Sequence, residues 1–224
     1  MLKTFSLLTL ALFSLFQFGS AQTHMGLKSG KIVFEISYKD PNMDENNKAM
    51  MPKESIMYFN DDKMRVEVSM AMGTTVIISD NVSQKSTVLM DFMGKKIAME
   101  TNQEQTKKEM EKSGKIKVEK LPGSKVIAGY TCKKAKISQT TNGKESSFDV
   151  WYTNEISAKN SYTNGFEGID GCMLEFEIFQ SGMQMKLTTK SISKEEVSSS
   201  MFIIPDGYTI TTADGLKTLL GGGY

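Results

Sequence analysis

The sequence Lys125-Val126-Ile127-Ala128-Gly129-Tyr130-Thr131-Cys132-Lys133-Lys134-Ala135 is the starting point for predicting the fold. A second run of strand-forming residues, Phe148-Asp149-Val150-Trp151-Tyr152, follows after a polar segment that contains Asn142-Gly143. Asn-Gly between two such runs is a strong β-hairpin signal, because both residues accept the positive φ angles of a tight turn. We therefore expect two paired strands, with Phe148, Val150 and Tyr152 on one face and Trp151 on the other.

Strand patterns also cover most of the remaining chain. The clearest alternation places Met64, Val66, Val68, Met70 and Met72 on one face. Short turn-forming segments separate the strands, namely Asn60-Asp61-Asp62-Lys63, Asp80-Asn81, Gly94-Lys95-Lys96 and Pro122-Gly123. No segment of a dozen residues has the apolar stripe of an amphipathic helix, so folds that alternate strands with helices are not expected. We predict a mostly β fold with about ten to eleven strands in one antiparallel sheet, which forms a closed or half-open barrel or two packed sheets.

Three segments are expected to interrupt or end this sheet. Residues 40–52 are polar and contain two prolines, so we expect a loop. Residues 101–113 are charged and lack a β-branched run, which favours a short solvated helix or a mobile loop. Residues 201–211 are expected to end the fold as a strand, which Pro205 restricts to an edge or a strand end.

The N-terminal residues have the features of a secretory signal peptide. Lys3 precedes an apolar run over residues 5–18, and Gly19-Ser20-Ala21 provides small residues for cleavage. The run is about fourteen residues, shorter than the ~20 that a membrane-spanning helix needs. We predict an exported, periplasmic or extracellular chain without a transmembrane anchor, organised as a signal peptide over residues 1–21, a flexible N-terminus over 22–29, a single β domain over 30–212 and a C-terminal tail over 213–224.

The charge balance argues against a polyanionic partner. The chain has 27 basic and 26 acidic residues, and removing Lys3 with the signal peptide leaves 27 − 1 = 26 of each. A net charge near zero does not favour nucleic acid as a partner. Arg65 is the only arginine, which excludes phosphate clamps built from several guanidinium groups.

The residues that most enzymes and metal sites require are absent or badly spaced. His24 is the only histidine, so neither a multi-histidine metal site nor a Ser-His or Cys-His pair is expected. The segment after Asp40 begins like a calcium loop but has Glu45 where that loop needs glycine and Met51 where it needs glutamate. Glu175 and Glu177 share one strand face, as a catalytic pair would, but outer-face carboxylates are usually solvated. We predict no enzymatic activity, no cofactor and no metal.

Methionine and cysteine leave alternatives open. The chain has 17 methionines, which fill irregular cores, line adaptable apolar pockets or bind Cu(I). The candidates for copper are the pairs Met70 with Met72 and Met183 with Met185. In an exported chain the two cysteines, Cys132 and Cys172, favour a disulfide, and two separate buried thiols are the alternative.

Several of these segments, taken in order, resemble a known family. They are Ile127-Ala128-Gly129-Tyr130-Thr131-Cys132-Lys133-Lys134-Ala135, Val150-Trp151-Tyr152-Thr153, residues 171–177 and Pro205-Asp206-Gly207-Tyr208. Together they are similar to the domain of unknown function 4412 family of exported bacterial envelope proteins. The resemblance implies a fold similar to the lipoprotein-localisation factors, in which a half-open antiparallel barrel cups a hydrophobic cavity. It implies no catalytic residues, because the family has no established activity.

These observations lead to three hypotheses. In the first, a non-enzymatic protein binds a hydrophobic or lipid-like ligand in the concave face of the sheet. The residues expected to line that face are large and apolar: Phe34, Met64, Met70, Phe148, Phe176 and Met185. The alternative is an envelope interaction or scaffold protein that has a filled core, an envelope protein as its partner and no ligand. The third is Cu(I) binding through the methionine pairs.

Overall fold

The computed structural model describes residues 26–39, 43–101, 104–105, 115–141, 144–158, 166, 168–180, 183–212 and 215. The first half of this part of the chain contains β1 (Ser29–Tyr38), α1 (Glu45–Met50), β2 (Glu54–Asn60), β3 (Lys63–Met70), β4 (Gly73–Asp80), β5 (Lys85–Phe92) and β6 (Lys95–Thr101). The second half contains β7 (Lys115–Ile127), β8 (Tyr130–Thr141), β9 (Lys144–Thr153), β10 (Cys172–Gln180), β11 (Met183–Lys194), η2 (Ser199–Phe202) and β12 (Thr209–Thr211).

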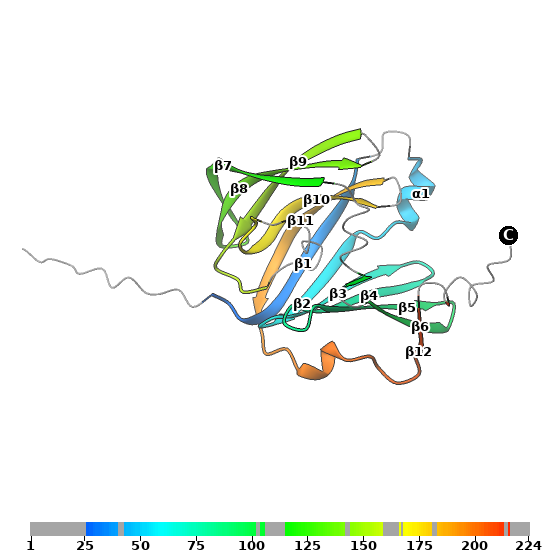
Figure 1. The fold of residues 1–224 in the computed structure, drawn as a ribbon. Helices are drawn as coiled ribbons and strands as arrows, with labels where there is room; N and C mark the ends of the chain where they lie inside the picture. Colours follow the sequence, from blue (N-terminus) through cyan, green and yellow to red (C-terminus); the bar gives the residue numbers. More distant parts are fainter. Residues whose placement is uncertain are drawn as a thin grey trace, which may run out of the picture.

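The described strands form a single sheet of twelve, in the order β12-β6-β5-β4-β3-β2-β1-β11-β10-β9-β8-β7. Two meanders, β2 to β6 and β7 to β11, flank the central strand β1. Strand pairs are antiparallel except β12 with β6. Figure 1 shows the two meanders as the walls of a curled sheet that does not close. The prediction of a mostly β, single curled antiparallel sheet is confirmed, with twelve strands in place of ten to eleven.

The main core lies between the two walls. Residues directly opposite each other in an antiparallel pair share a face of the sheet. Ile32, Met57 and Val66 are linked in this way across β1, β2 and β3, and all three are buried. The same buried cluster contains residues of β8 to β11, including Phe176, whose ring meets that of Phe34 edge to face at 5.8 Å between centroids. Because this cluster joins both walls, it occupies the concave side of the sheet.

The opposite, convex face of β3 to β6 is covered by the C-terminal strap, which we define as residues 195–211. After β11 the strap passes beneath these strands and ends in β12, which pairs with β6 (Figure 1). The strap residues Phe202, Ile204 and Tyr208 pack on a second, smaller buried cluster. That cluster consists of Val76, Ile78, Leu89 and Ala98. In addition, Arg65 Nη1 donates to the carbonyl oxygen of Met201 at 3.1 Å.

The strap corrects the prediction of one final strand over residues 201–211. The segment instead contains the end of η2, an irregular stretch and the three-residue strand β12. Pro205 has no N–H for a strand ladder, and Gly207 has a φ of 87°, a value that turns the chain. The expected edge position is nevertheless found, because β12 is the outermost strand beside β6.

The expected central hairpin is present as β8 and β9. Ala135 lies opposite Val150, and Ile137 lies opposite Phe148. As alternation predicts, Phe148, Val150 and Tyr152 are buried on the core side, while half-buried Trp151 lies on the other face. The Asn142-Gly143 turn is outside the described residues, although the strands that it connects pair up to Thr141 and Lys144.

Two turns lie elsewhere than predicted. The run that was expected to be one strand turns at Ala128-Gly129, whose φ angles are 48° and 88°, so Ile127 ends β7 and Tyr130 begins β8. Pro122-Gly123, expected to be a turn, lies inside β7. The ladder to β8 absorbs the two residues as an irregularity between Leu121 and Ser124.

Two other segments also differ from the prediction. The expected loop over residues 40–52 contains α1, which begins where the Asp44 side chain accepts a hydrogen bond from the N–H of Asn47 at 2.8 Å. The strand expected to reach Met72 ends at Met70, because Ala71 and Met72 form the turn to β4. The predicted signal peptide and most of residues 101–113 lie outside the described residues. In the part of the chain that is described, no helix is long and apolar enough to cross a membrane.

Candidate functional site

The concave faces of β3 to β6 carry a set of apolar side chains that the core does not fully enclose. The pairing register aligns Val66, Ile77, Val88 and Met99 in one row. A second row consists of Val68, Thr75, Met90 and Ile97. Five apolar members of these rows are half-buried. We call these five the concave strip: Val68, Ile77, Val88, Met90 and Met99.

The concave strip differs from the other face of the same strands. Val68 and Ile77 pack against the main core, but Val88, Met90 and Met99 pack against neither of the two clusters formed by described residues. On the convex face, by contrast, the strap covers the apolar side chains of β4, β5 and β6. The strands therefore have two apolar faces, and the described part of the chain covers one of them more completely.

The six residues predicted to line the site divide into two groups. Five of them are between 1% and 8% exposed and belong to the main core. They are Phe34, Met64, Phe148, Phe176 and Met185. The sixth, Met70, is 45% exposed at the end of β3. The sequence reasoning missed the concave strip, although the alternation of Val88 and Met90 in β5 is a signal that identifies part of it.

Two buried hydroxyl groups lie on the same concave face. Ser55 lies opposite Phe34 and Val68, and Ser79 lies opposite Met64. Both serines are at most 2% exposed, and neither hydroxyl has a hydrogen-bond partner among the described residues. A buried hydroxyl without a partner costs free energy. These two hydroxyls lie beneath the concave surface, whereas Thr75, in the second row, is a half-buried polar residue of the surface itself.

Comparison with known proteins identifies the family. The model of a family described as Domain of unknown function (DUF4412) matches residues 42–165, more than half of the 224-residue chain. The chain belongs to the DUF4412 family. No curated protein matches it. The matched span of this DUF4412 protein includes the concave strip.

Two solved structures show weak similarity to this DUF4412 protein. Lipoprotein LppX from Mycobacterium tuberculosis has 9% sequence identity and a TM-score of 0.32, and the match covers 77% of this chain and 90% of that one. LprF from Mycobacterium bovis has 11% identity and a TM-score of 0.33, with 82% and 92% covered.

The convex face of β7 to β11 carries a network of ion pairs around Trp151. Lys125 Nζ lies 4.6 Å from the centre of the Trp151 ring and 2.7 Å from a Glu175 carboxylate oxygen. Lys186 Nζ is 3.0 Å from the other oxygen of Glu175. Burial would raise the pKa of the Glu175 carboxyl, but the hydrogen bonds and charges of the two lysines outweigh burial and lower that pKa. Glu175 is therefore held ionised, as a structural partner rather than a proton donor.

This network corrects the expectation that Glu175 and Glu177 are solvated. Glu177 is also largely buried, and its carboxylate pairs with Lys39.

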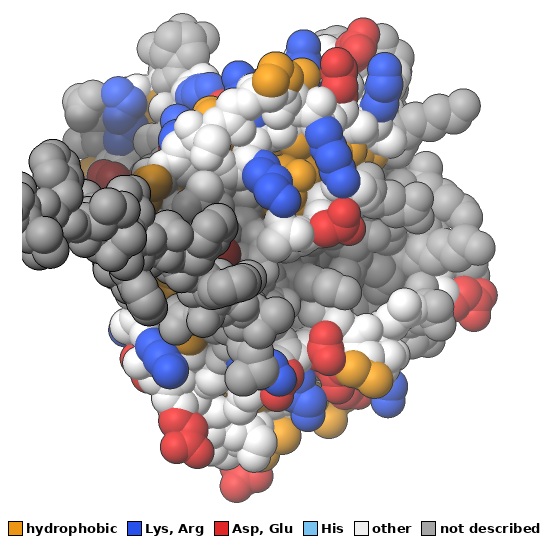
Figure 2. Space-filling view, turned by 90° about the vertical axis from the view of Figure 1, so that its left-hand side faces the viewer, with side chains coloured by type: hydrophobic (Ala, Val, Ile, Leu, Met, Phe, Trp, Pro, Cys, Tyr) orange, Lys and Arg blue, Asp and Glu red, His pale blue; other side chains and the backbone are white. Residues whose placement is uncertain are grey.

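A surface hollow of about 450 Å³ lies over this face, lined by charged and polar side chains together with Trp151 and Phe148. Figure 2, seen from the side where β7 and β8 lie in Figure 1, shows lysine side chains interspersed with hydrophobic and acidic ones. In the described part of the chain no group of three His, Cys, Asp or Glu residues is placed to hold a metal ion.

The two cysteines are free, buried thiols in the structure, so the predicted disulfide is not formed here. Cys132 is in β8 and Cys172 begins β10, and β9 lies between these strands. Two strands separated by a third are about 10 Å apart, beyond the ~7 Å that a disulfide allows between Cα atoms. Burial raises the pKa of Cys132 to about 11. Burial, with the neighbouring Cys132, also raises the pKa of Cys172.

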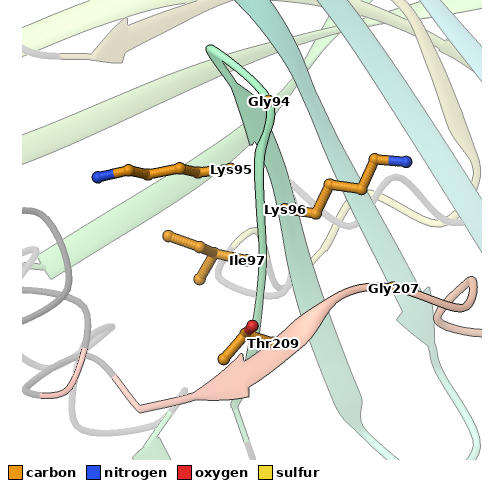
Figure 3. A pocket seen from close by; sticks show the side chains of 6 residues that line it. All are labelled: Gly94, Lys95, Lys96, Ile97, Gly207 and Thr209. Atoms are coloured by element: carbon orange, nitrogen blue, oxygen red, sulfur yellow. The ribbon is translucent and has the colours of Figure 1, made fainter.

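A second surface hollow, of about 410 Å³, lies where the strap meets the β5–β6 hairpin (Figure 3). It is lined by Gly94, Lys95, Lys96, Ile97, Gly207 and Thr209. Figure 3 shows Lys95 and Lys96 pointing to opposite sides of β6. The Lys96 Nζ lies 5.9 Å from the ring centre of Tyr208, so it contributes to holding the strap.

Proposed function

We propose that this DUF4412 protein is an exported, non-enzymatic protein that binds a hydrophobic or lipid-like ligand on the concave face of its curled sheet. The concave strip is the observation that carries the proposal. Its valine, isoleucine and methionine side chains are half-buried in a curved wall, and three of them pack against neither buried cluster. Covering apolar surface yields about 25 cal/mol per Å², so an acyl chain lying on this strip gains free energy.

The chemistry of the strip suits a ligand of variable shape. Met90 and Met99 have flexible thioether side chains that adjust to irregular apolar partners. Thr75, half-buried in the second row between Val68 and Met90, offers a hydroxyl group to a polar part of such a ligand, whereas the hydroxyls of Ser55 and Ser79 are enclosed. Apolar walls with a few polar groups are typical of small-molecule sites.

One observation favours the alternative, an envelope scaffold with a filled core. Five of the six residues first expected to line a cavity are closely packed in the main core. On that reading the ligand site does not exist, and function resides on the outer surface, where the Trp151 ion-pair network lies. The two readings differ in what they predict for an added apolar ligand.

The test measures the affinity of the protein for a fluorescent fatty acid, and its displacement by an unlabelled one, in a matched pair of variants in β5. Val88→Glu places a carboxylate on the concave face, while Thr87→Glu places one on the convex face, because adjacent strand residues point to opposite sides. We expect Val88→Glu to weaken binding at least about tenfold and Thr87→Glu to leave it within about twofold. Melting temperatures verify that both variants are folded.

Native mass spectrometry of the protein purified from its own envelope provides the second measurement. Copurification of a lipid-sized mass, lost on extraction with organic solvent, supports the proposal. A single unliganded mass, together with no binding of the fluorescent fatty acid to the wild-type chain, would establish the filled-core alternative.

A further inference from the structure

Two adjacent hairpin tips at one end of the sheet expose large apolar side chains. The β3–β4 turn contains Ala71-Met72 and the β5–β6 turn contains Met93-Gly94. The N–H of Met93 donates to the carbonyl oxygen of Met72 at 3.4 Å, so the tips lie side by side. The exposed side chains are Met70 (45%), Met72 (57%), Phe92 (41%) and Met93 (79%). We call these four residues the apolar tips.

The backbone conformation of the β5–β6 turn does not explain why a methionine stands there. Met93 has a φ of 51° and is followed by Gly94 at 80°, a pair of positive angles that favours Asn, Asp or Gly at the first position. The β2–β3 turn at the opposite end of the sheet follows that preference, because Asp61, also at 51°, is followed by Asp62. A methionine in this backbone conformation is unusual, and its side chain gains nothing from packing because it is largely exposed. Exposed apolar groups that form a cluster mark interaction sites.

The charge beside the tips identifies the kind of partner. In β6, Lys95 lies opposite Phe92 and therefore shares its face, and the side chain is exposed. Lys96 points to the other side of the strand (Figure 3). Asp91 lies opposite Lys96 and is half-buried, so it lies away from the face that Lys95 and Phe92 share. Apolar side chains at a protruding tip with a lysine beside them are typical of segments that enter the headgroup region of an anionic bilayer.

The tips are also continuous with the concave strip. Phe92 is followed on the same face of β5 by Met90 and Val88, and Met70 is followed in β3 by Val68. Phe92 and Met70 at the tips are exposed, whereas the next residues inward, Met90 and Val88 in β5 and Val68 in β3, are half-buried. The surface that would meet a membrane thus leads into the wall of the cup.

We propose that the apolar tips dock this protein on the surface of an anionic lipid bilayer. Met72 and Met93 enter the interface, Phe92 and Met70 lie at its boundary, and Lys95 contacts lipid phosphate. The proposal does not depend on ligand binding in the cup, because docking requires only the tips.

Flotation with phosphatidylcholine vesicles, with and without phosphatidylglycerol, tests the proposal on the full mature chain. The test variant combines Met72→Ser with Met93→Asn, and Asn accepts the backbone conformation of Met93. The matched control is Val82→Ser, which removes an equally exposed apolar side chain (76%) from the β4–β5 loop at the other end of the sheet. We expect the double variant to lose at least about tenfold in partitioning onto the phosphatidylglycerol vesicles, and the control to match the wild type. Lys95→Gln should lose about fivefold on these vesicles and little on phosphatidylcholine alone.

Three results would overturn the proposal. The first is that the wild-type chain floats with neither kind of vesicle, and the second is that the double variant floats as well as the wild type. The third is that Val82→Ser loses as much partitioning as the double variant. If size-exclusion chromatography instead shows a dimer that the double variant dissociates, without vesicle binding, the tips join two copies of the chain. The double variant should bind the fluorescent fatty acid as tightly as the wild type does, which separates a failure of docking from a failure of ligand binding.

Discussion

Replacing Gly171 by alanine is expected to be among the most damaging single changes in this protein. Gly171 precedes β10 and has a φ of 149°. A Cβ atom added there would lie 2.2 Å from the carbonyl oxygen of Thr153 and 2.8 Å from its carbonyl carbon. Thr153 is fully buried and lies opposite Cys172 in the β9–β10 ladder. Because the clash is with backbone, no rotation of a side chain relieves it, and the two strands must move apart.

The magnitude follows from comparison with Gly129. That glycine also has a positive φ, 88°, but an added Cβ would have no heavy atom within 4 Å. Gly129→Ala therefore has only the conformational cost, about 1–2 kcal/mol. Gly171→Ala adds displacement of the buried β9–β10 ladder, and we expect a total of about 4 kcal/mol, in the range of the most severe single substitutions. Domains of this kind are stable by about 5–15 kcal/mol, so the variant is folded only marginally.

Urea unfolding followed by tryptophan fluorescence measures the difference. The only tryptophan, Trp151, lies in β9 opposite Glu175 of β10, so the signal reports on the ladder that the substitution disturbs. The free energy of unfolding is obtained from the midpoint and slope of each transition. If Gly171→Ala and Gly129→Ala reduce stability by the same amount within about 0.5 kcal/mol, the steric reasoning is wrong, because the matched glycine then accounts for the whole effect.

Three further predictions follow from the described contacts. Glu175→Gln should lower the melting temperature at neutral pH but not in acid. The folded-state pKa of Glu175 is lowered, so its stabilisation is present above the unfolded pKa and is lost as pH falls through the folded pKa. If the variant and the wild type differ as much in melting temperature in acid as at neutral pH, the prediction is wrong. Cys132 and Cys172 should resist iodoacetamide in the native chain, and both should react after unfolding without reductant, which mass spectrometry counts; no adduct after unfolding would show that they form a disulfide. Phe176→Ala should cost about 3–5 kcal/mol in urea unfolding, whereas Met70→Ala at the exposed end of β3 should cost less than about 0.5, and similar losses would refute the core assignment.

Strand alternation predicted the sheet because it depends on neighbouring residues only. Phe148, Val150 and Tyr152 are buried as their spacing indicates, and Trp151 lies on the opposite face. The turns were less predictable, because a two-residue turn can form wherever two residues tolerate positive φ. Ala128-Gly129 is such a case, and alanine carries no turn signature of its own.

The candidate site could be predicted only in part, because burial depends on contacts between distant segments. Phe34, Phe176 and Met64 were expected to line a cavity on account of their size, but large apolar side chains are also the ones that fill a core. The concave strip depends instead on which face of β4 to β6 the strap covers. Residues 195–211 contain no pattern that indicates a crossing to β6, more than ninety positions earlier in the chain. The predicted signal peptide and the turn at Asn142-Gly143 lie outside the described residues and stay predictions.

The two faces of β4 to β6 provide the strongest connection between the fold and the proposals. An antiparallel sheet commonly has one apolar and one solvated face, and such strands show simple alternation. Here Val76, Ile78 and Leu89 are apolar on the convex side, while Val88 and Met90 are apolar on the concave side. A sheet that is apolar on both faces must be covered on both to be stable in water. The strap is held on the convex side by the side chain of Arg65 and by β12. The concave side, which has a half-buried strip leading to exposed tips, has the surface expected of a wall that receives an apolar partner from the direction of those tips.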